Sequence, residues 1–245
     1  MIKVITKPSV TGQTGSSEVA RIRAEYARRS REIPPDFYSW ARDVNLFFHC
    51  QIARTTIRSL QASGMYPLQG CSVLDVGCGG GTWLLEFAQW GAEKLHGLDL
   101  DPTRLETAHR VLPGADLRCG DAQTLPWRDQ SFDLVSHFTM FTSILDAGVK
   151  RAVAQEMLRV LKPGGLILWY DFRVNNPANH NVRGIGASEI RSLFPGCDVK
   201  LKRAMLAPPL ARRIVPLTWI GALLLEKIPW LRTHYVAVIR HSAAV

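Results

Sequence analysis

The sequence lacks the features that would mark a membrane, secreted or zinc-binding protein. Its longest apolar run, residues 220–225 with Trp219 before it, is far shorter than the ~20 residues that a membrane-spanning helix needs. Its five cysteines are scattered and form no Cys-x-x-Cys pair, which argues against a disulfide framework and a zinc site. The N-terminus lacks an apolar core followed by a cleavage site, so no signal peptide is expected. We therefore expect a reduced cytoplasmic compartment and no bound metal.

Positive charge is in excess, with a formal net charge of +9 and a pI near 9.6 over 245 residues. The basic side chains concentrate in residues 21–31 and 200–213, whereas the central part of the chain is close to balanced. Such clusters suit a nucleic acid, an anionic membrane surface or an acidic substrate, and they suit solvated faces equally well. The composition, 47% hydrophobic and 21% charged, is that of a globular enzyme with a core of ordinary size.

The chain divides into three segments of different texture. Residues 1–17 are rich in Thr, Ser and Gly and are expected to form a flexible tail. Residues 18–66 hold two helical patterns separated by a pair of prolines and are expected to form a helical cap. In residues 67–245 strands alternate with helices, which predicts a doubly wound α/β fold with a seven-stranded, mostly parallel sheet and an apolar helical insertion, residues 207–232, before the last strand. The expected strands are 72–76, 94–100, 115–119, 132–136, 166–170, 199–206 and 235–240.

The sharpest motif is a glycine-rich turn between the first expected strand of this domain and the helix after it. Glycines let the chain turn hard and let the backbone press against a ligand, while the helix N-terminus offers free N–H groups. Asp75 stands inside the strand, where a site for a dinucleotide, which carries a pyrophosphate, usually has an apolar or small residue. A carboxylate there suits a ligand with an ammonium group and no phosphates.

This segment resembles motif I of the class I S-adenosylmethionine-dependent methyltransferases, Asp-x-Gly-x-Gly-x-Gly, which Asp75, Gly77, Gly79 and Gly81 match. The resemblance implies that S-adenosylmethionine is the cofactor and S-adenosylhomocysteine the product. It further implies that the turn, Cys78 included, borders the methionine part of the cofactor. Asp75 would hold the cofactor's amino group, directly or through water.

Two later motifs support the resemblance. Asp99 ends the second expected strand, where a carboxylate can accept hydrogen bonds from both ribose hydroxyls. Asp101, just before a proline, fits the cap of the following helix instead. By the resemblance, Leu100 lies on the adenine face, Asp121 pairs with the adenine amino group, and the backbone N–H of Ala122 contacts the ring.

The fourth expected strand resembles the family's strand that ends at the methyl-transfer centre, which leaves His137 and Phe138 at the mouth of the cofactor site. Residues 156–165 resemble the family's helix and turn before strand five, a feature of the fold without chemistry. A Rossmann dehydrogenase shares the glycine-rich turn. Several motifs in the order of the methyltransferase family favour that family instead.

Three residues are candidates for catalysis. Methyl transfer is an in-line displacement, so alignment supplies much of the acceleration, and a base is needed only if the acceptor must lose a proton. His137 is the first candidate because a histidine ordinarily titrates near neutral pH, although it could equally pack beside the cofactor. Tyr170 and Asp171, which follow strand five, are the other two.

The residues expected to contact the acceptor come from two places. Arg173 and Asn175 begin an aromatic and amide-rich loop that would grip a polar acceptor such as a sugar, or would only shape its own turns. In the cap, Tyr26, Tyr38 and Trp40 are expected to cover the site and exclude water, or simply to seat the cap on the sheet.

Several functions remain open at this point. The favoured one is methyl transfer to a small-molecule, glycan or lipid-linked acceptor. Residues 207–232 would either pack as a helix pair, which we favour, or form an interfacial element that brings the protein to the inner face of a membrane. An RNA methyltransferase is disfavoured because residues 137–140 lack the Asn/Asp-Pro-Pro-aromatic motif and no Pro-Cys nucleophile is present, so no nucleic-acid partner is expected. A non-catalytic cofactor-binding scaffold is the remaining alternative.

Overall fold

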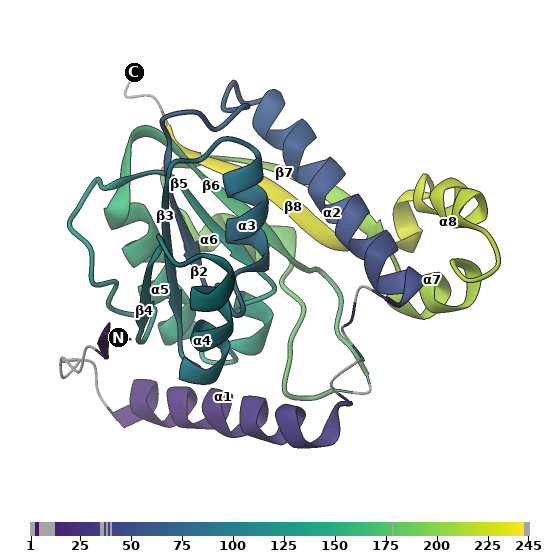
Figure 1. The fold of residues 1–245 in the computed structure, drawn as a ribbon, viewed down its shortest axis with the longest axis horizontal. Helices are drawn as coiled ribbons and strands as arrows, with labels where there is room; N and C mark the ends of the chain where they lie inside the picture. The colour runs from purple at the N-terminus through teal and green to yellow at the C-terminus, as the bar shows by residue number, and fades with distance from the viewer. Residues whose placement is uncertain are drawn as a thin grey trace.

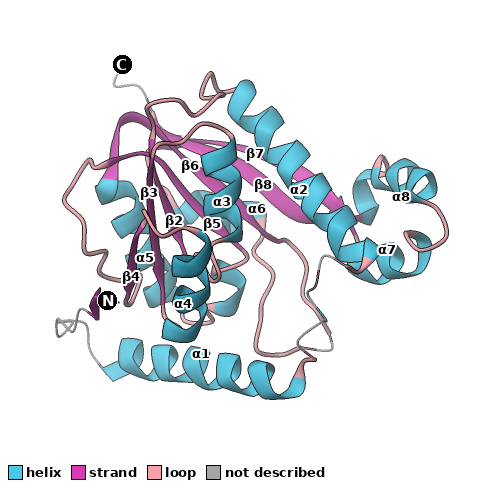
Figure 2. Cartoon of the chain, in the orientation of Figure 1, coloured by secondary structure: helices cyan, strands magenta, loops and turns pink. Residues whose placement is uncertain are grey.

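The computed structural model describes residues 3–4, 13–34, 37, 39, 41–177 and 179–242. These residues form an eight-stranded sheet with helices on both faces (Figure 1 and Figure 2). The strand order is β1-β4-β3-β2-β5-β6-β8-β7. The strands are β1 (Lys3–Val4), β2 (Ser72–Val76), β3 (Lys94–Asp99), β4 (Asp116–Cys119), β5 (Phe132–Phe138), β6 (Leu161–Phe172), β7 (Cys197–Leu206) and β8 (Arg232–His241).

The direction of the strands confirms the predicted doubly wound fold. Strands β2 to β6 pair in parallel, whereas β8 runs antiparallel to both β6 and β7. Every residue of β2 is buried, as expected for a parallel strand covered on both faces. The chain order reverses between β2 and β5, and ligands bind open α/β sheets at the carboxyl ends of strands that flank such a reversal.

The helices cover both faces of the sheet, and one of them lies along an edge. Helices α2, α3 and α4 contribute to the apolar cluster on one face, and α5 and α6 contribute to the cluster on the other. Helix α1 runs across the carboxyl edge of the sheet (Figure 1). The helices are α1 (Gln13–Glu32), α2 (Asp43–Gln61), α3 (Thr82–Gln89), α4 (Pro102–Val111), α5 (Ala147–Val160), α6 (Ala187–Leu193), α7 (Pro208–Ile214) and α8 (Trp219–Glu226), with short 3₁₀ turns η2 (Phe141–Ser143) and η3 (Pro229–Leu231).

The N-terminal part contains the expected helices and, before them, a short edge strand. Lys3 and Val4 pair in parallel with Arg118 and Cys119 of β4 as an edge strand, and α1 already begins at Gln13. Residues 5–12 lie outside the described residues. The second helix of this part, α2, begins at Asp43 and ends at Gln61. Helix α6, which was not expected, follows β6 and precedes β7 in the chain. It buries Ile190 and Leu193.

The predicted helical insertion before the last strand is confirmed. Helices α7 and α8 form a lobe at one end of the sheet, beside the N-terminal half of α2 (Figure 1). Phe47 of α2 meets Trp219 of α8 edge to face, with the ring centroids 5.5 Å apart. In the described part of the chain, no helix has both the length and the apolarity to cross a membrane.

Candidate functional site

The glycine-rich turn after β2 adopts a backbone that only glycine accepts readily. Gly77, Gly79 and Gly81 have φ values of 77°, 53° and 83°, in the left-handed region. A Cβ on Gly81 would lie 3.1 Å from the Cβ of Ala108 in α4, and one on Gly77 would lie 3.1 Å from Cγ of Met140. The turn thus brings α3 close to α4 and leaves the backbone of Gly77 covered by a methionine side chain.

Asp99 ties the end of β3 to this turn. Its Oδ2 accepts a hydrogen bond from the backbone N–H of Gly79 at 2.8 Å, and its Oδ1 accepts one from the N–H of Asp101 at 2.9 Å. Only 4% of the residue is exposed, and burial raises the pKa of the carboxyl. Each carboxylate oxygen has a second lone pair, so Asp99 retains acceptors for further hydroxyl groups.

Asp75 is buried beneath the turn. Its Oδ1 accepts a hydrogen bond from Oγ of Ser136 in β5 at 2.7 Å, and burial raises its pKa to about 7. A nearby ammonium group would favour the charged carboxylate and lower this pKa. Cys78 turns its side chain into the core, since its Sγ would lie 2.7 Å from a Cβ on Gly97. Only the backbone of Cys78 is therefore placed to face a ligand.

Asp121 and Ala122 follow β4 on the same edge of the sheet. Asp121 accepts hydrogen bonds from the backbone N–H and the side-chain amide of Gln123, at 2.9 and 2.8 Å. Asp121 and Ala122 line one crevice together with Gly77, Asp99 and Leu100. Asp101, in contrast, accepts the N–H of Thr103 at 2.9 Å and caps α4, which confirms the cap predicted for this residue.

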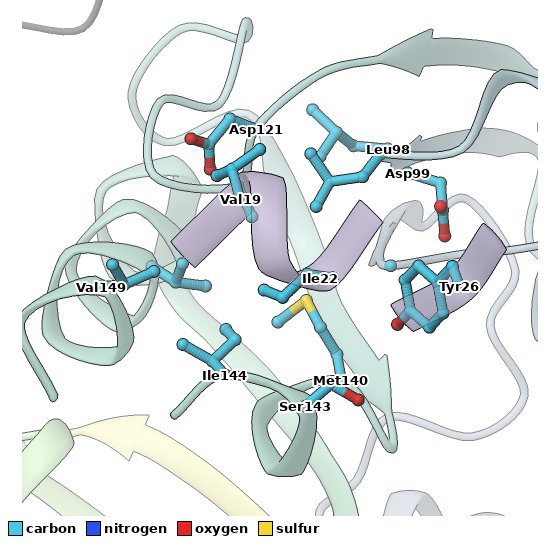
Figure 3. A pocket seen from close by; sticks show the side chains of 14 residues that line it. Val19, Ile22, Tyr26, Leu98, Asp99, Asp121, Met140, Ser143, Ile144 and Val149 are labelled. Carbon is cyan, nitrogen blue, oxygen red and sulfur yellow. The ribbon is translucent and has the colours of Figure 1, made fainter. Parts of the chain in front are cut away.

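Helix α1 closes this crevice from outside. Val19, Ile22 and Tyr26 line it, with Ile22 beside Met140 and Tyr26 on the side of Asp99 (Figure 3). Residues of the loop after β5 complete the apolar wall. The crevice encloses about 50 Å³, so a larger ligand requires α1 or the lining side chains, such as Met140, to move.

A set of hydrogen bonds latches α1 to the loop between β5 and α5. Oε1 of Glu18 accepts the N–H groups of Leu145 and Asp146, at 2.6 and 3.4 Å. Nη2 of Arg21 donates to the carbonyl of Ser143 at 2.5 Å and pairs with Glu18 at 2.8 Å. Hydrogen bonds to Arg21 lower the pKa of Glu18, so the latch is charged at neutral pH.

Known proteins match the part of the sequence that builds this crevice. Residues 73–165 match the family described as "Methyltransferase domain". The chain is 31% identical over 194 residues to the phthiotriol/phenolphthiotriol dimycocerosates methyltransferase of Mycobacterium tuberculosis, covering 76% of this chain and 66% of that protein. The chain belongs to the class I S-adenosylmethionine-dependent methyltransferases.

Two further likenesses extend this finding. The sterol 4-C-methyltransferase strm-1 of Caenorhabditis elegans is 30% identical over 151 residues, which are 59% of this chain and 41% of that protein. A Haemonchus contortus phosphoethanolamine N-methyltransferase, solved with phosphoethanolamine and S-adenosylhomocysteine, has the same fold with a TM-score of 0.63, 14% identity and coverage of 95% and 51% of the two chains. This chain spans less than two thirds of the length of the curated relatives that it matches.

The groups that line the crevice are complementary to the family's cofactor, S-adenosylmethionine. A buried acid with spare lone pairs stands at the end of β3, where the sequence motif assigns the ribose. The apolar Leu100 and Ala122 flank Asp121, where the motif assigns the adenine. The residues present therefore fit this group, and Tyr26 of α1 lines the same crevice.

His137 and Phe138 do not lie together at the mouth of the site. His137 is fully buried, with its ring 4.2 Å from Trp169 and 4.7 Å from Phe141, and burial lowers its pKa to about 3. Among the described residues, neither ring nitrogen has a hydrogen-bond partner. This placement does not suit a general base. Phe138 points to the opposite face of the sheet and stacks on Trp83, with 4.2 Å between centroids.

The other two catalytic candidates are also structural in their contacts. Asp171 is buried and accepts hydrogen bonds from Oγ1 and N of Thr142, at 2.7 and 3.0 Å, and burial raises its pKa to about 6. It thereby fixes the loop that follows β5. Tyr170 is 3% exposed and stacks on His234, and burial raises its pKa far above the ordinary value.

The expected acceptor contacts are dispersed. Arg173 lies over the ring of Tyr235 at 5.5 Å and donates to the carbonyl of Arg232 at 3.1 Å. Oδ1 of Asn175 accepts the N–H of Gly184 at 2.9 Å. This hydrogen bond closes the loop that contains Asn175, which agrees with the interpretation that the loop shapes its own turns. Tyr38 and Trp40 lie outside the described residues.

Sequence reasoning missed Thr139, Met140 and Trp83. Thr139 is exposed and has a left-handed φ of 56°, which is strained for a threonine. Strained residues of this kind cluster at functional sites. Met140 covers Gly77. Trp83 stacks on Phe138. One signal was present in the sequence, because Trp83 opens the helix directly after the glycine turn and must therefore lie near the same edge of the sheet.

Proposed function

We propose that this chain transfers the methyl group of S-adenosylmethionine to a small-molecule acceptor of lipid-like character by in-line displacement. The observation that carries the proposal is the crevice at the carboxyl edge, where Asp99 and Asp121 lie side by side next to the glycine-rich turn, beneath α1. The relatives support the class of acceptor, since their names specify dimycocerosates and a sterol.

The acceptor would lie beyond the end of β5. Thr139 is the exposed residue there, between Met140, which lines the cofactor crevice, and Phe138. Phe138, Trp83 and His49 stack in a continuous row, with centroid spacings of 4.2 and 5.3 Å. This aromatic wall presents the edges of its stacked rings, and it offers dispersion contacts to a ring or chain and few hydrogen bonds to a sugar. It therefore favours a lipid-like acceptor over a glycan.

The residues near this wall provide alignment more readily than base catalysis. Burial lowers the pKa of His137 and of His234 to about 3, so both rings are neutral and do not take up a proton at neutral pH. The imidazole of His49 borders the wall, and its Nε2 lies 2.7 Å from Oε1 of Glu86. Because Nε2 of His49 is already engaged by Glu86, proximity to the activated sulfonium carries the reaction.

The cofactor part of the proposal is tested by calorimetric titration with S-adenosylhomocysteine. Asp99→Ala removes an acceptor for two hydroxyl groups, each worth about 1.5–3 kcal/mol when the acceptor is charged, and should weaken binding by about 100-fold or more. Asp101→Asn is the matched control, because asparagine caps a helix as well as aspartate does. It should leave the affinity unchanged. Equal affinity of Asp99→Ala and the wild type would refute the assignment.

The transfer step needs a separate assay. Wild-type protein is incubated with methyl-labelled cofactor and an organic extract of lipids, and the label is followed into the organic phase. We expect transfer by the wild type and none by Asp99→Ala. Tight binding of S-adenosylhomocysteine without transfer to any extract would instead support the cofactor-binding scaffold.

A further inference from the structure

A second groove lies away from the cofactor crevice, between α2, β7 and the lobe formed by α7 and α8. It measures about 720 Å³, within the range of ligand-binding clefts. Six cationic side chains line it, against one carboxylate, that of Glu226. The cationic residues are Arg54, Arg58, Lys202, Arg203, Lys227 and Arg232.

Most of this positive charge is not neutralised within the protein. Arg54 pairs with Glu226 at 3.0 Å, and Arg232 donates to the carbonyls of Glu226 and Lys227. The other four lie at the surface and form no ion pair with any described residue. They come from three separate elements, so the concentration of charge is a product of the fold.

The same groove has an exposed apolar wall. Ile220 and Leu224, one helical turn apart on α8, both line it and are 71% and 56% exposed. Leu217 and Trp230, in the same lobe, are 80% and 76% exposed, so four of the seven large apolar side chains exposed among the described residues belong to this lobe. A helix that is apolar on nearly every side is normally buried, and α8 leaves this side uncovered.

We propose that this lobe docks on an anionic phospholipid surface. Ile220 and Leu224 enter the interfacial layer, and the cations of the groove pair with lipid phosphates. Apolar side chains next to unpaired cations are the combination that binds acidic bilayers. A nucleic acid would use the cations but would leave Ile220 and Leu224 in water. A symmetric dimer through this face would bring two sets of unpaired cations together, which is unfavourable. The inference rests on the lobe alone and holds whichever acceptor is methylated.

The test is cosedimentation of the full chain with vesicles of phosphatidylcholine alone and of phosphatidylcholine mixed with phosphatidylglycerol. We expect binding to the mixed vesicles only, weakened by salt. Lys202→Gln with Arg203→Gln should reduce partitioning about 30-fold, at about 1 kcal/mol for each cation near the surface. Ile220→Ser with Leu224→Ser should reduce it at least about tenfold. Both changes are at exposed positions, and thermal unfolding checks that each variant folds.

The matched control is Arg151→Gln with Arg191→Gln, two exposed cations on α5 and α6. It removes the same charge and should bind as the wild type does. Equal binding by the control pair and the Lys202/Arg203 pair would reduce the effect to net charge and overturn the proposal. So would absence of binding to the mixed vesicles. Self-association that Ile220→Ser with Leu224→Ser abolishes would assign the face to a second copy, and a gel shift with RNA that persists in that variant would assign the groove to nucleic acid.

Discussion

Replacing His137 by leucine should stabilise the protein and leave methyl transfer intact. The ring is fully buried between Trp169 and Phe141, and its two nitrogens lack partners among the described residues. Leucine has a similar volume and no polar atoms. Removing a buried polar group that makes no hydrogen bond recovers its desolvation cost, which is about 1–3 kcal/mol at neutral pH.

The stabilisation should grow as the pH falls. Burial lowers the pKa of His137 from 6.5 to about 3, so the unfolded chain takes up a proton before the folded protein does. Stability is therefore lost progressively below pH 6.5 and the loss is complete below about pH 3. The full loss is on the order of 5 kcal/mol, at 1.36 kcal/mol per pKa unit, and about 2 kcal/mol of it is present at pH 5. The leucine variant escapes this loss.

Urea unfolding at about pH 8 and about pH 5 measures the effect as the difference between variant and wild type. Using the difference cancels the contributions of His234, Asp75 and Asp171, whose shifted pKa values also make stability depend on pH. His241→Leu, at an exposed position, is the control and should show no such change. A difference that does not widen toward pH 5, or a loss of transfer in His137→Leu with cofactor affinity retained, would refute the reasoning and return His137 to the active site.

Two other predictions concern the cofactor crevice. Gly81→Ala should cost about 1–3 kcal/mol of unfolding free energy, because residue 81 has a φ of 83° and the new Cβ would press on Ala108 at 3.1 Å, and urea unfolding that matches the wild type would contradict this. Glu18→Ala removes the acceptor that latches α1 to the N–H groups of Leu145 and Asp146, and it should speed dissociation of S-adenosylhomocysteine about tenfold in stopped flow. An unchanged dissociation rate would mean that α1 does not gate the crevice.

The sequence predicts the fold and the acid residues of the crevice well because these depend on local patterns. Strand–glycine–helix turns, an aspartate before a proline and the order of the motifs are all short-range features. They led to the doubly wound sheet and to Asp101 as the cap of α4, and the structure confirms both. The role of Asp99 at the ribose stays a prediction.

His137 shows where such reasoning fails. Side chains alternate across a strand, and β5 is covered on both faces, so its sequence gives no amphipathic phase from which to tell the two sides apart. Whether His137 or Phe138 faces a given layer depends on the register of β5 with β6, which pairs His137 with Trp169. Such a tertiary fact is absent from the local sequence.

The docking of α1 was unpredictable for a similar reason. Its inner face consists of single apolar residues, among them Val19 and Ile22, in a strongly basic segment. Those residues meet Met140 and Ile144 only because α1 crosses the carboxyl edge of the sheet. Residues so far apart in the chain carry no sequence pattern that announces the contact.

The most direct test of the account is a crystal structure of the chain grown with S-adenosylhomocysteine. We expect the ribose hydroxyls on the carboxylate of Asp99, the adenine between Leu100 and Asp121, and the amino-acid end along the backbone of the glycine turn, with α1 moved outward. A ligand bound elsewhere, or a crevice still filled by Ile22 and Met140 at saturating ligand, would contradict it.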